Sequence, residues 1–322
     1  MIPRLIFILS MPRAGSTLLQ RLLLAHGCCT SIGEHSLMLR VLGEDAVIQR
    51  RATYGERLIE TSLCDLRAAC PDFDEAYRSG VRKMAMDVYD RLAGGKPWFV
   101  DKTPRYHLIC EELIKTFPEA KFLVLWRHPL AVAASMVSTF RNDEWTMDEF
   151  GIDLHAGMER LLAFSEKHAD SICQVRYEDL VTQPGKCLQR LGNYLGWDDL
   201  ERVLENELPA HNNGRLGDPT GGKKYANVSA ASKDAWKGAY NNWFRQSWAA
   251  DYFSGERRNA FEAQGYTLPA ALAEGKPANL LAGAKEWLRA AKRRRRKITH
   301  PRQPTGYCRE FHEKHGYHIH FS

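Results

Sequence analysis

The sequence predicts an α/β fold, a doubly wound parallel sheet flanked by helices, and two apolar runs carry this prediction. Leu5–Leu9 and Phe122–Trp126 are continuous apolar stretches, with the length and composition of strands buried on both faces. Each run is followed by a proline-containing turn and then by apolar residues at helical spacing. Strands that alternate with helices form parallel sheets, and 322 residues with 44% hydrophobic composition can bury a large core.

The turn after the first run has the pattern of an anion site. Pro12 and Gly15 interrupt the apolar pattern, and Leu18–Ala25 then shows apolar residues at helical spacing. We expect Ser16 or Thr17 to cap the start of this helix. The first free N–H groups of a helix and the positive end of its dipole point into such a turn, where a phosphate or sulfate can bind.

The turn differs from the phosphate-binding loop of nucleotide triphosphatases, and the differences indicate which anion it binds. A Walker A loop reads G-x-x-x-x-G-K-[ST], with a lysine for the terminal phosphates and a hydroxyl for magnesium. Here Ser10 stands at the first glycine and Ser16 at the lysine. A P-loop-type sheet is still expected, but ATP hydrolysis is disfavoured.

The segment Pro12–Leu19, PRAGSTLL, resembles the 5'-phosphosulfate loop of sulfotransferases that use 3'-phosphoadenosine-5'-phosphosulfate (PAPS). The likeness extends to bacterial members and to the tyrosylprotein sulfotransferases. It implies PAPS as the donor co-substrate. A strand-turn-helix junction without a ligand is the alternative. The residues that the resemblance places around the 5'-phosphosulfate are Arg13, Ala14, Gly15, Ser16 and Thr17.

Glu34 is expected at the carboxyl end of the second strand or just beyond it. It lies 21 residues after Arg13, the register of the catalytic glutamate in the tyrosylprotein sulfotransferases that this segment resembles. An attacking alcohol must lose its proton, and a carboxylate within hydrogen-bond reach can take it. The resemblance therefore implies a general base, and a structural duty beside the site is the alternative.

Lys102 follows a third strand signal, Trp98–Val100. Pro104 moves Thr103 away from helical geometry, so Lys102 can be held at the carboxyl rim of the sheet, where ligands bind. The D-K-T-P stretch is similar to one in bacterial and tyrosylprotein sulfotransferases. This likeness implies that Lys102 contacts the sulfate and the leaving phosphate oxygen. The alternative is a solvated charge.

Arg127 and Ser135 follow the strand Phe122–Trp126, and Pro129 suits the first turn of the helix between them. Their spacing of eight residues matches the 3'-phosphate pattern of the family that the chain resembles. A guanidinium group and a hydroxyl suit a terminal phosphate dianion. Together with the first turn, this second motif strengthens the resemblance to sulfotransferases that use PAPS.

The resemblance to the family implies two further residues near the nucleotide, Tyr177 and Ser232. Tyr177 follows a strand signal in the string R-Y-E-D-L-V, which is similar to the family's, and is expected where that strand turns into a loop near the nucleotide. Filling the core is the alternative. Ser232 matches a serine that touches the sulfate and nucleotide in tyrosylprotein enzymes, with a helix N-cap as the alternative. The glycine-rich segment 214–222 predicts a loop that covers the site.

These residues together predict a PAPS-dependent sulfotransferase that acts on a hydroxyl acceptor by in-line displacement. Positive side chains can neutralise the developing charge, so no metal is expected. A carbohydrate, a glycolipid or a small metabolite is the expected acceptor. A P-loop kinase and a catalytically silent nucleotide-binding protein remain as alternatives.

The charge lies mainly in the tail. The net charge is +6, and residues 285–302 contribute nine basic side chains and one acid, which leaves about −2 for the rest and argues against a nucleic-acid surface. We expect a sulfotransferase domain over residues 1–270 and a basic extension over 271–322, in a cytoplasmic protein. Residues 278–297 could form a basic helix that contacts an anionic membrane, or a solvated run.

Overall fold

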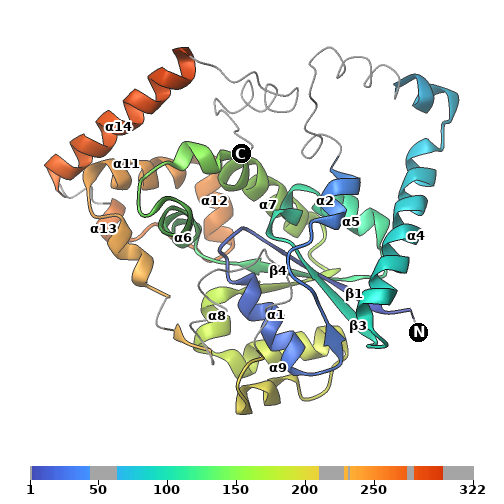
Figure 1. The fold of residues 1–322 in the computed structure, drawn as a ribbon. Coiled ribbons are helices and arrows are strands. Elements are labelled where there is room, and N and C mark those ends of the chain that lie inside the picture. The colour runs from blue at the N-terminus through green and yellow to red at the C-terminus, as the bar shows by residue number, and fades with distance from the viewer. Residues whose placement is uncertain (1, 44–63, 210–227, 231–232, 274–278, 300–322) are drawn as a thin grey trace.

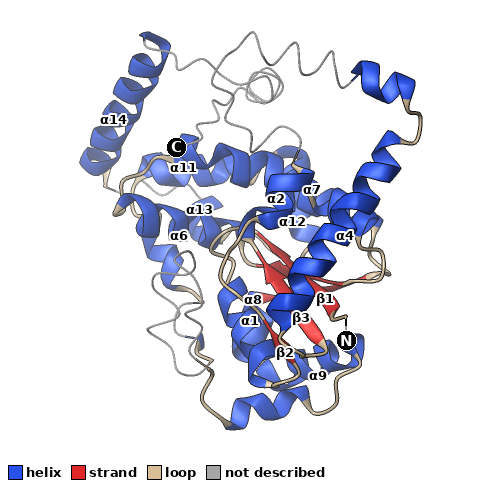
Figure 2. Ribbon diagram, turned by 45° about the vertical axis from the view of Figure 1, so that its right-hand side comes forward, coloured by secondary structure: helices blue, strands red, loops and turns tan. Residues whose placement is uncertain are grey.

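The computed structural model describes residues 2–43, 64–209, 228–230, 233–273 and 279–299. At its centre is a five-stranded sheet in the order β2-β3-β1-β4-β5, in which every pair of neighbours is parallel (Figure 2). The predicted parallel α/β sheet is confirmed. The strands are β1 (Arg4–Ser10), β2 (Cys29–Thr30), β3 (Trp98–Lys102), β4 (Lys121–Trp126) and β5 (Ile172–Arg176).

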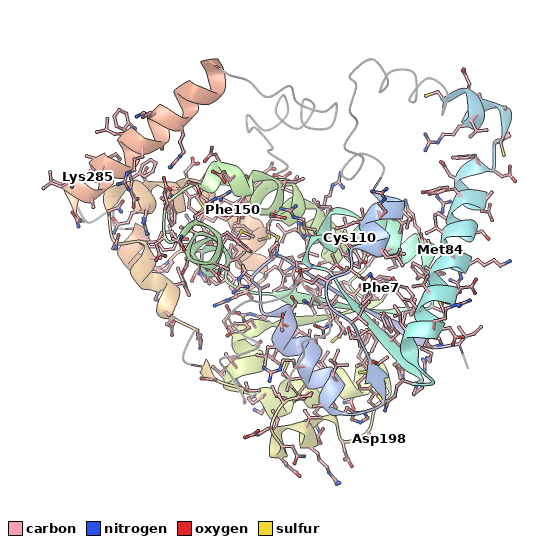
Figure 3. All side chains as sticks on the ribbon, in the orientation of Figure 1. Phe7, Met84, Cys110, Phe150, Asp198 and Lys285 are labelled. Atoms are coloured by element: carbon pink, nitrogen blue, oxygen red, sulfur yellow. The ribbon has the colours of Figure 1, made fainter. Side chains whose placement is uncertain are left out.

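β1 is the central strand because its side chains are apolar on both faces. Leu5–Leu9 are all buried, and the ring of Phe7 stacks on Phe122 of β4 with centroids 5.5 Å apart. Figure 3 shows Phe7 deep among the side chains around the sheet. Burying a side chain of this size stabilises the fold by roughly 1.5–3 kcal/mol. The core therefore fixes where β1 and β4 end, and with them the two turns that follow.

Helices cover both faces of the sheet, which explains why its strands are continuous apolar runs. Figure 1 shows α1, α8 and α9 on one side of the sheet, and α5 and α7 on the other. The helix α4 packs against β3 and the edge strand β2. The bounds of these helices are α1 (Ser16–Ala25), α4 (Phe73–Ala93), α5 (Cys110–Thr116), α7 (Met158–Lys167), α8 (Tyr177–Thr182) and α9 (Pro184–Leu195).

Residues 64–69 are also helical, and further helices lie elsewhere in the described part of the chain. They are α2 (Leu37–Leu42), α6 (Pro129–Arg141), α11 (Trp243–Tyr252), α12 (Gly255–Ala263), α13 (Ala270–Ala273) and α14 (Leu280–Thr299). Short 3₁₀ turns cover Pro104–Leu108, Met147–Phe150, Leu200–Glu205 and Ala235–Ala239, and a π-helical turn covers Ile152–Gly157. Within the described residues, no helix is both long and apolar enough to cross a bilayer.

The strand order places a switch point between β1 and β4. After β1 the chain runs to β2 and β3 on one side, and after β4 it runs to β5 on the other. Where the connections after two neighbouring parallel strands run to opposite sides of the sheet, a crevice forms beside the carboxyl ends of these strands. Ligands bind in this crevice in doubly wound sheets. The turns after β1 and β4, which carry Arg13 and Arg127, lie at this crevice.

Two local expectations were wrong. Neither Ser16 nor Thr17 caps α1, because Gly15 occupies the N-cap position with φ 101° and Ser16 is already the first helical residue. Glycine adopts this left-handed conformation without a steric cost, so the chain can turn one residue earlier. Tyr177 does not lie in a loop but begins α8, where acidic residues in the first turn favour a helix start.

Candidate functional site

The start of α1 presents backbone N–H groups toward the turn after β1. The first helical hydrogen bond runs from the Leu18 N–H to the Gly15 carbonyl across 3.0 Å. The N–H groups of Ser16 and Thr17 precede this bond, and they belong to the donors that a helix start leaves for an anion. The turn therefore has the backbone geometry of a phosphate or sulfate site.

The turn is curled by two residues with positive φ. Arg13 has φ 67° and Gly15 has φ 101°, and between them the Ala14 N–H donates to the Met11 carbonyl across 3.2 Å. The side chain of Ala14 is fully buried. The core thus holds the middle of the turn, while the backbone before α1 and the half-buried side chain of Arg13 lie at the crevice.

The ring of Tyr177 packs against the turns that follow β1 and β4. A Cβ atom built at Gly15 would lie 2.6 Å from Tyr177 Cδ2, so only glycine fits there. The guanidinium carbon of Arg127 lies 4.4 Å from the centroid of the same ring. Because Tyr177 is 7% exposed, it fills the core under the two turns.

Arg127 joins the turn after β4 to the turn after β1. Its Nη1 donates to the Arg13 carbonyl across 2.9 Å, and burial lowers the pKa of its guanidinium. In the opposite direction, Arg13 Nε donates to Ser135 Oγ of α6 across 3.4 Å, although 122 residues separate the two. The residues predicted to bind the 5' end of the donor and those predicted to bind its 3' end therefore form one continuous cluster. Within it, the Arg13 side chain contacts Ser135.

Glu34 and Lys102 form an ion pair at the end of β3. Lys102 Nζ donates to Glu34 Oε1 across 2.7 Å, with the lysine side chain 2% and the glutamate side chain 22% exposed. The parallel register sets Lys102 beside Ile8, two residues before the end of β1. Glu34 lies four residues past β2. The pair therefore lies at the same edge of the sheet as the turns that follow β1 and β4.

A buried hydrogen-bond network supports this pair, and the sequence reasoning missed it. Asp101, which precedes Lys102, is 1% exposed. Its Oδ2 accepts hydrogen bonds from Tyr89 Oη across 2.5 Å and from Tyr106 Oη across 2.9 Å, and its Oδ1 lies 3.2 Å from His35 Nε2. The only signal in the sequence was an acidic residue at the end of an apolar strand.

The network also perturbs the side chains that form it. Burial, together with the charge of Asp101, raises the pKa of both Tyr89 and Tyr106 well above the ordinary tyrosine value. Burial alone would lower the pKa of His35, but its hydrogen bond to Asp101 and the charge of Asp101 outweigh burial and raise the pKa. Since His35 directly follows Glu34, the network fixes the backbone on both sides of the ion pair.

A second buried group, His107 with Asp153, lies at the end of β1. His107 Nε2 is 3.3 Å from Asp153 Oδ1, and His107 Nδ1 lies 2.7 Å from the Pro104 carbonyl and 3.2 Å from that of Ser10. Burial would raise the pKa of Asp153, but His107 and Arg105 more than offset it and lower the pKa. The histidine thus links the end of β1 to the π-helical turn.

Two predictions fall outside the described residues. Ser232 and the glycine-rich segment 214–222 both lie there. Among the residues that the structure does describe, no group of three histidine, cysteine or acidic side chains is close enough to hold a metal ion. The described site brings together the start of α1 and the side chains of Arg13, Lys102, Arg127 and Ser135.

The amino-acid sequence matches a family model and several curated proteins. A family model described as the Sulfotransferase family matches residues 3–201. Nodulation protein NoeE of Sinorhizobium fredii is 31% identical over 222 residues, covering 61% of this chain and 51% of that protein. Protein-tyrosine sulfotransferase 1 of Danio rerio is 26% identical over 215 residues, covering 63% and 56%. The chain therefore spans about half the length of these curated relatives.

Solved structures agree on the fold. The sulfotransferase domain from the curacin biosynthetic pathway has a TM-score of 0.56 at 21% identity, covering 83% of this chain and 99% of that one. The sulfotransferase domain from the Synechococcus PCC 7002 olefin synthase has a TM-score of 0.52 at 25% identity, covering 83% and 96%. With the family model matching well over half of its length, the chain belongs to the sulfotransferase family.

Proposed function

We propose that the protein transfers a sulfuryl group from PAPS to a hydroxyl acceptor by in-line displacement. The observation that carries the proposal is the hydrogen bond from Arg127 Nη1 to the Arg13 carbonyl across 2.9 Å. It joins the turns after β1 and β4 at the switch point of the sheet. A donor with phosphate groups at its 5' and 3' ends can therefore be held by both turns at once.

The 5'-phosphosulfate binds to the backbone N–H groups at the start of α1, with Ser16 and Thr17 beside them. The 3'-phosphate binds to Arg127 and Ser135, because a guanidinium and a hydroxyl together suit a phosphate dianion. Arg13 adds a second guanidinium on that side, since its Nε already lies 3.4 Å from Ser135 Oγ. Tyr177 holds Arg127 in place through its ring.

Glu34 and Lys102 carry the chemistry in this proposal. Glu34 takes the proton of the acceptor hydroxyl while the acceptor oxygen forms its bond to sulfur. The bond between sulfur and the bridging oxygen breaks, and its electron pair stays on that oxygen, which leaves with 3'-phosphoadenosine 5'-phosphate (PAP). Lys102 stabilises the growing charge there. An ammonium has three N–H donors, so one can stay with Glu34 while another serves the leaving oxygen.

The acceptor is proposed to be a carbohydrate, a glycolipid or a small metabolite. A protein tyrosine must be included in any screen because of the similarity to protein-tyrosine sulfotransferase 1. Incubating the full chain with radiolabelled PAPS and panels of glycans, glycolipids and tyrosyl peptides identifies the class. Transfer of label to one class supports the proposal, and label released only as free sulfate with every panel contradicts it.

Calorimetry with PAP, AMP and ADP tests the donor, with and without magnesium. Each charge-assisted hydrogen bond contributes about 1.5–3 kcal/mol, so two contacts to the 3'-phosphate should make PAP bind roughly 100-fold or more tightly than AMP. Magnesium should add nothing to PAP binding. ADP that binds more tightly than PAP, and only with magnesium, would instead indicate a kinase. PAP binding without transfer to any acceptor would indicate a silent nucleotide-binding protein.

A further inference from the structure

α14 is fixed to the body of the protein along one face. Arg245 of α11 pairs with Glu286, with Nη2 and Oε1 2.5 Å apart. At the far end of the helix, Arg293 pairs with Glu144 and donates to the Trp145 carbonyl across 2.7 Å. Figure 1 shows α14 lying next to α11 at the outside of the molecule. The helix is therefore held in one orientation, with a defined outer face.

Close packing near its first turn reinforces this orientation. A Cβ atom built at Gly283 would lie 2.2 Å from Trp243 Nε1, so the glycine lets α14 approach α11 closely. Trp243 Nε1 also donates to the Leu280 carbonyl across 3.3 Å. Residues 283, 286 and 293 follow helical spacing and mark the inner face.

The outer face carries large apolar side chains with no cover among the described residues. Leu281 and Leu288, seven residues apart on the same side, are 79% and 59% exposed, and Leu280 and Trp287 are 65% and 50% exposed. Four exposed large apolar residues on one helix form a contiguous patch, which marks an interaction surface. A partner that removed the apolar area of these four side chains from water would be held by the free energy of that burial.

A row of basic side chains borders the apolar patch. Lys285, Arg289 and Lys292 are all exposed, and Figure 3 shows Lys285 on the outer side of α14. Helical geometry places these three next to Leu281 and Leu288. Apolar residues on one side and lysine or arginine along the edge are the features of a helix that lies in the interface of a membrane.

We propose that α14 docks the protein onto the surface of an anionic lipid bilayer, with Leu280, Leu281, Trp287 and Leu288 inserted among the lipid chains and Lys285, Arg289 and Lys292 against the headgroups. Charge complementarity favours this occupant. Nucleic acid would satisfy the basic row but not the leucines. A second copy of the same face would bring like charges together.

α14 contacts the segment of chain that follows α6. Arg293 holds Glu144 and Trp145, which closely follow α6, the helix that carries Ser135. Docking is independent of the proposed chemistry, because none of its residues belongs to the phosphate-binding turns. Loss of membrane binding and loss of PAP binding can therefore be separated.

Co-sedimentation of the full chain with vesicles tests the proposal. We expect binding to phosphatidylcholine vesicles that contain about one quarter phosphatidylglycerol, and little binding to phosphatidylcholine alone. The triple variant K285E/R289E/K292E should reduce the partition coefficient roughly 100-fold or more. The double variant L281S/L288S should reduce it roughly tenfold or more at unchanged charge.

Matched controls carry the same changes elsewhere. K83E/K115E/K186E reverses three exposed lysines outside α14, and I2S/L66S replaces two exposed aliphatic residues; both should bind vesicles within about threefold of the wild type. Thermal unfolding and PAP binding should be unchanged in all four variants. The proposal is overturned if the wild type does not bind anionic vesicles, or if the α14 variants bind them as well as their controls do. It is also overturned if L281S/L288S changes only the oligomeric state, or if polyuridylate displaces the protein from the vesicles.

Discussion

Lys102 Nζ and Glu34 Oε1 lie 2.7 Å apart although 68 residues separate them in the chain. The contact is made at the end of β3, where Lys102 is almost fully buried and Glu34 remains partly exposed. A carboxylate that is partly exposed to solvent can contact an acceptor hydroxyl, and a buried ammonium beside it can donate a hydrogen bond to the leaving oxygen. The two proposed roles are thereby brought to adjacent atoms.

Replacing Glu34 by glutamine should stop transfer without stopping donor binding. The amide keeps the shape of the side chain but cannot take the acceptor proton, and general-base catalysis contributes about 10²–10⁴-fold to turnover. We expect turnover with the acceptor found by screening to fall by that factor, and the Kd for PAP measured by calorimetry to change less than about threefold.

The matched control for this change is Glu119→Gln. Glu119 is also paired with a cation, Arg82, across 2.6 Å, but its side chain is 52% exposed and it lies away from the proposed site. The control should retain full turnover. Full turnover in Glu34→Gln as well would remove Glu34 from the role of base.

Replacing Arg127 by alanine should weaken binding of the 3'-phosphate specifically. We expect PAP to bind roughly 10–100-fold less tightly, because one or two charge-assisted hydrogen bonds are lost. AMP, which lacks the 3'-phosphate, should lose much less. Arg82→Ala, at an exposed ion pair, should leave both affinities unchanged. Equal losses for PAP and AMP would place Arg127 elsewhere or show that the turn had collapsed.

The strands β1 and β4 and the positions of the turns that follow them could be predicted from the sequence because their signals are local. Leu5–Leu9 and Phe122–Trp126 are apolar without interruption, and only strands covered on both faces need such runs. The turns follow directly after them, so Arg13 and Arg127 could be assigned to the same edge of the sheet before their contact was known.

Contacts between distant segments could not be predicted. The hydrogen bond from Arg13 to Ser135 depends on how α6 lies against the first turn, and no local pattern encodes that. Asp153 pairs with His107 from a π-helical turn, which has no periodicity that separates it from an α-helix. The capping prediction at Ser16 failed because a serine before a helix is a common cap, whereas a glycine that packs on Tyr177 leaves no local sign.

Replacing Gly15 by alanine should destabilise the protein more than the same change at Gly27. Both glycines have positive φ, which costs an alanine about 1–2 kcal/mol. A Cβ at Gly15 also meets Tyr177 at 2.6 Å, whereas a Cβ at Gly27 meets nothing within 4 Å. Overpacking should add about 1–3 kcal/mol at Gly15, measured by urea unfolding.

A second background isolates the clash. In Tyr177→Ala, the cost of Gly15→Ala should fall to within about 1 kcal/mol of the cost of Gly27→Ala, since only the backbone strain remains. A difference that persists without the tyrosine ring would mean that the backbone of the turn, not the ring, selects glycine.

The pair formed by Asp153 and His107 should make stability depend on pH in the acidic range. The folded pKa of Asp153 is lowered, so its stabilisation is fully present above the unfolded value of about 4 and is lost as pH falls through the folded pKa. Asp153→Asn should cost on the order of 3 kcal/mol at neutral pH, and the gap to the wild type should close in strongly acidic urea titrations.

Asp199→Asn is the control, because Asp199 pairs with Arg202 while its side chain is 57% exposed. An exposed pair contributes at most about 1 kcal/mol, so this change should have little effect at any pH. If the gap between the wild type and Asp153→Asn stays constant as the pH falls, the buried aspartate does not hold a lowered pKa.

A crystal structure of the full chain with PAP bound tests most directly whether one donor is held by both turns. The 5'-phosphate should lie on the N–H groups at the start of α1, and the 3'-phosphate should lie within hydrogen-bond distance of Arg127 and Ser135, with the ribose spanning the crevice between β1 and β4. PAP found in another cavity, or bound with its 3'-phosphate in solvent and away from Arg127, would contradict the proposed donor site.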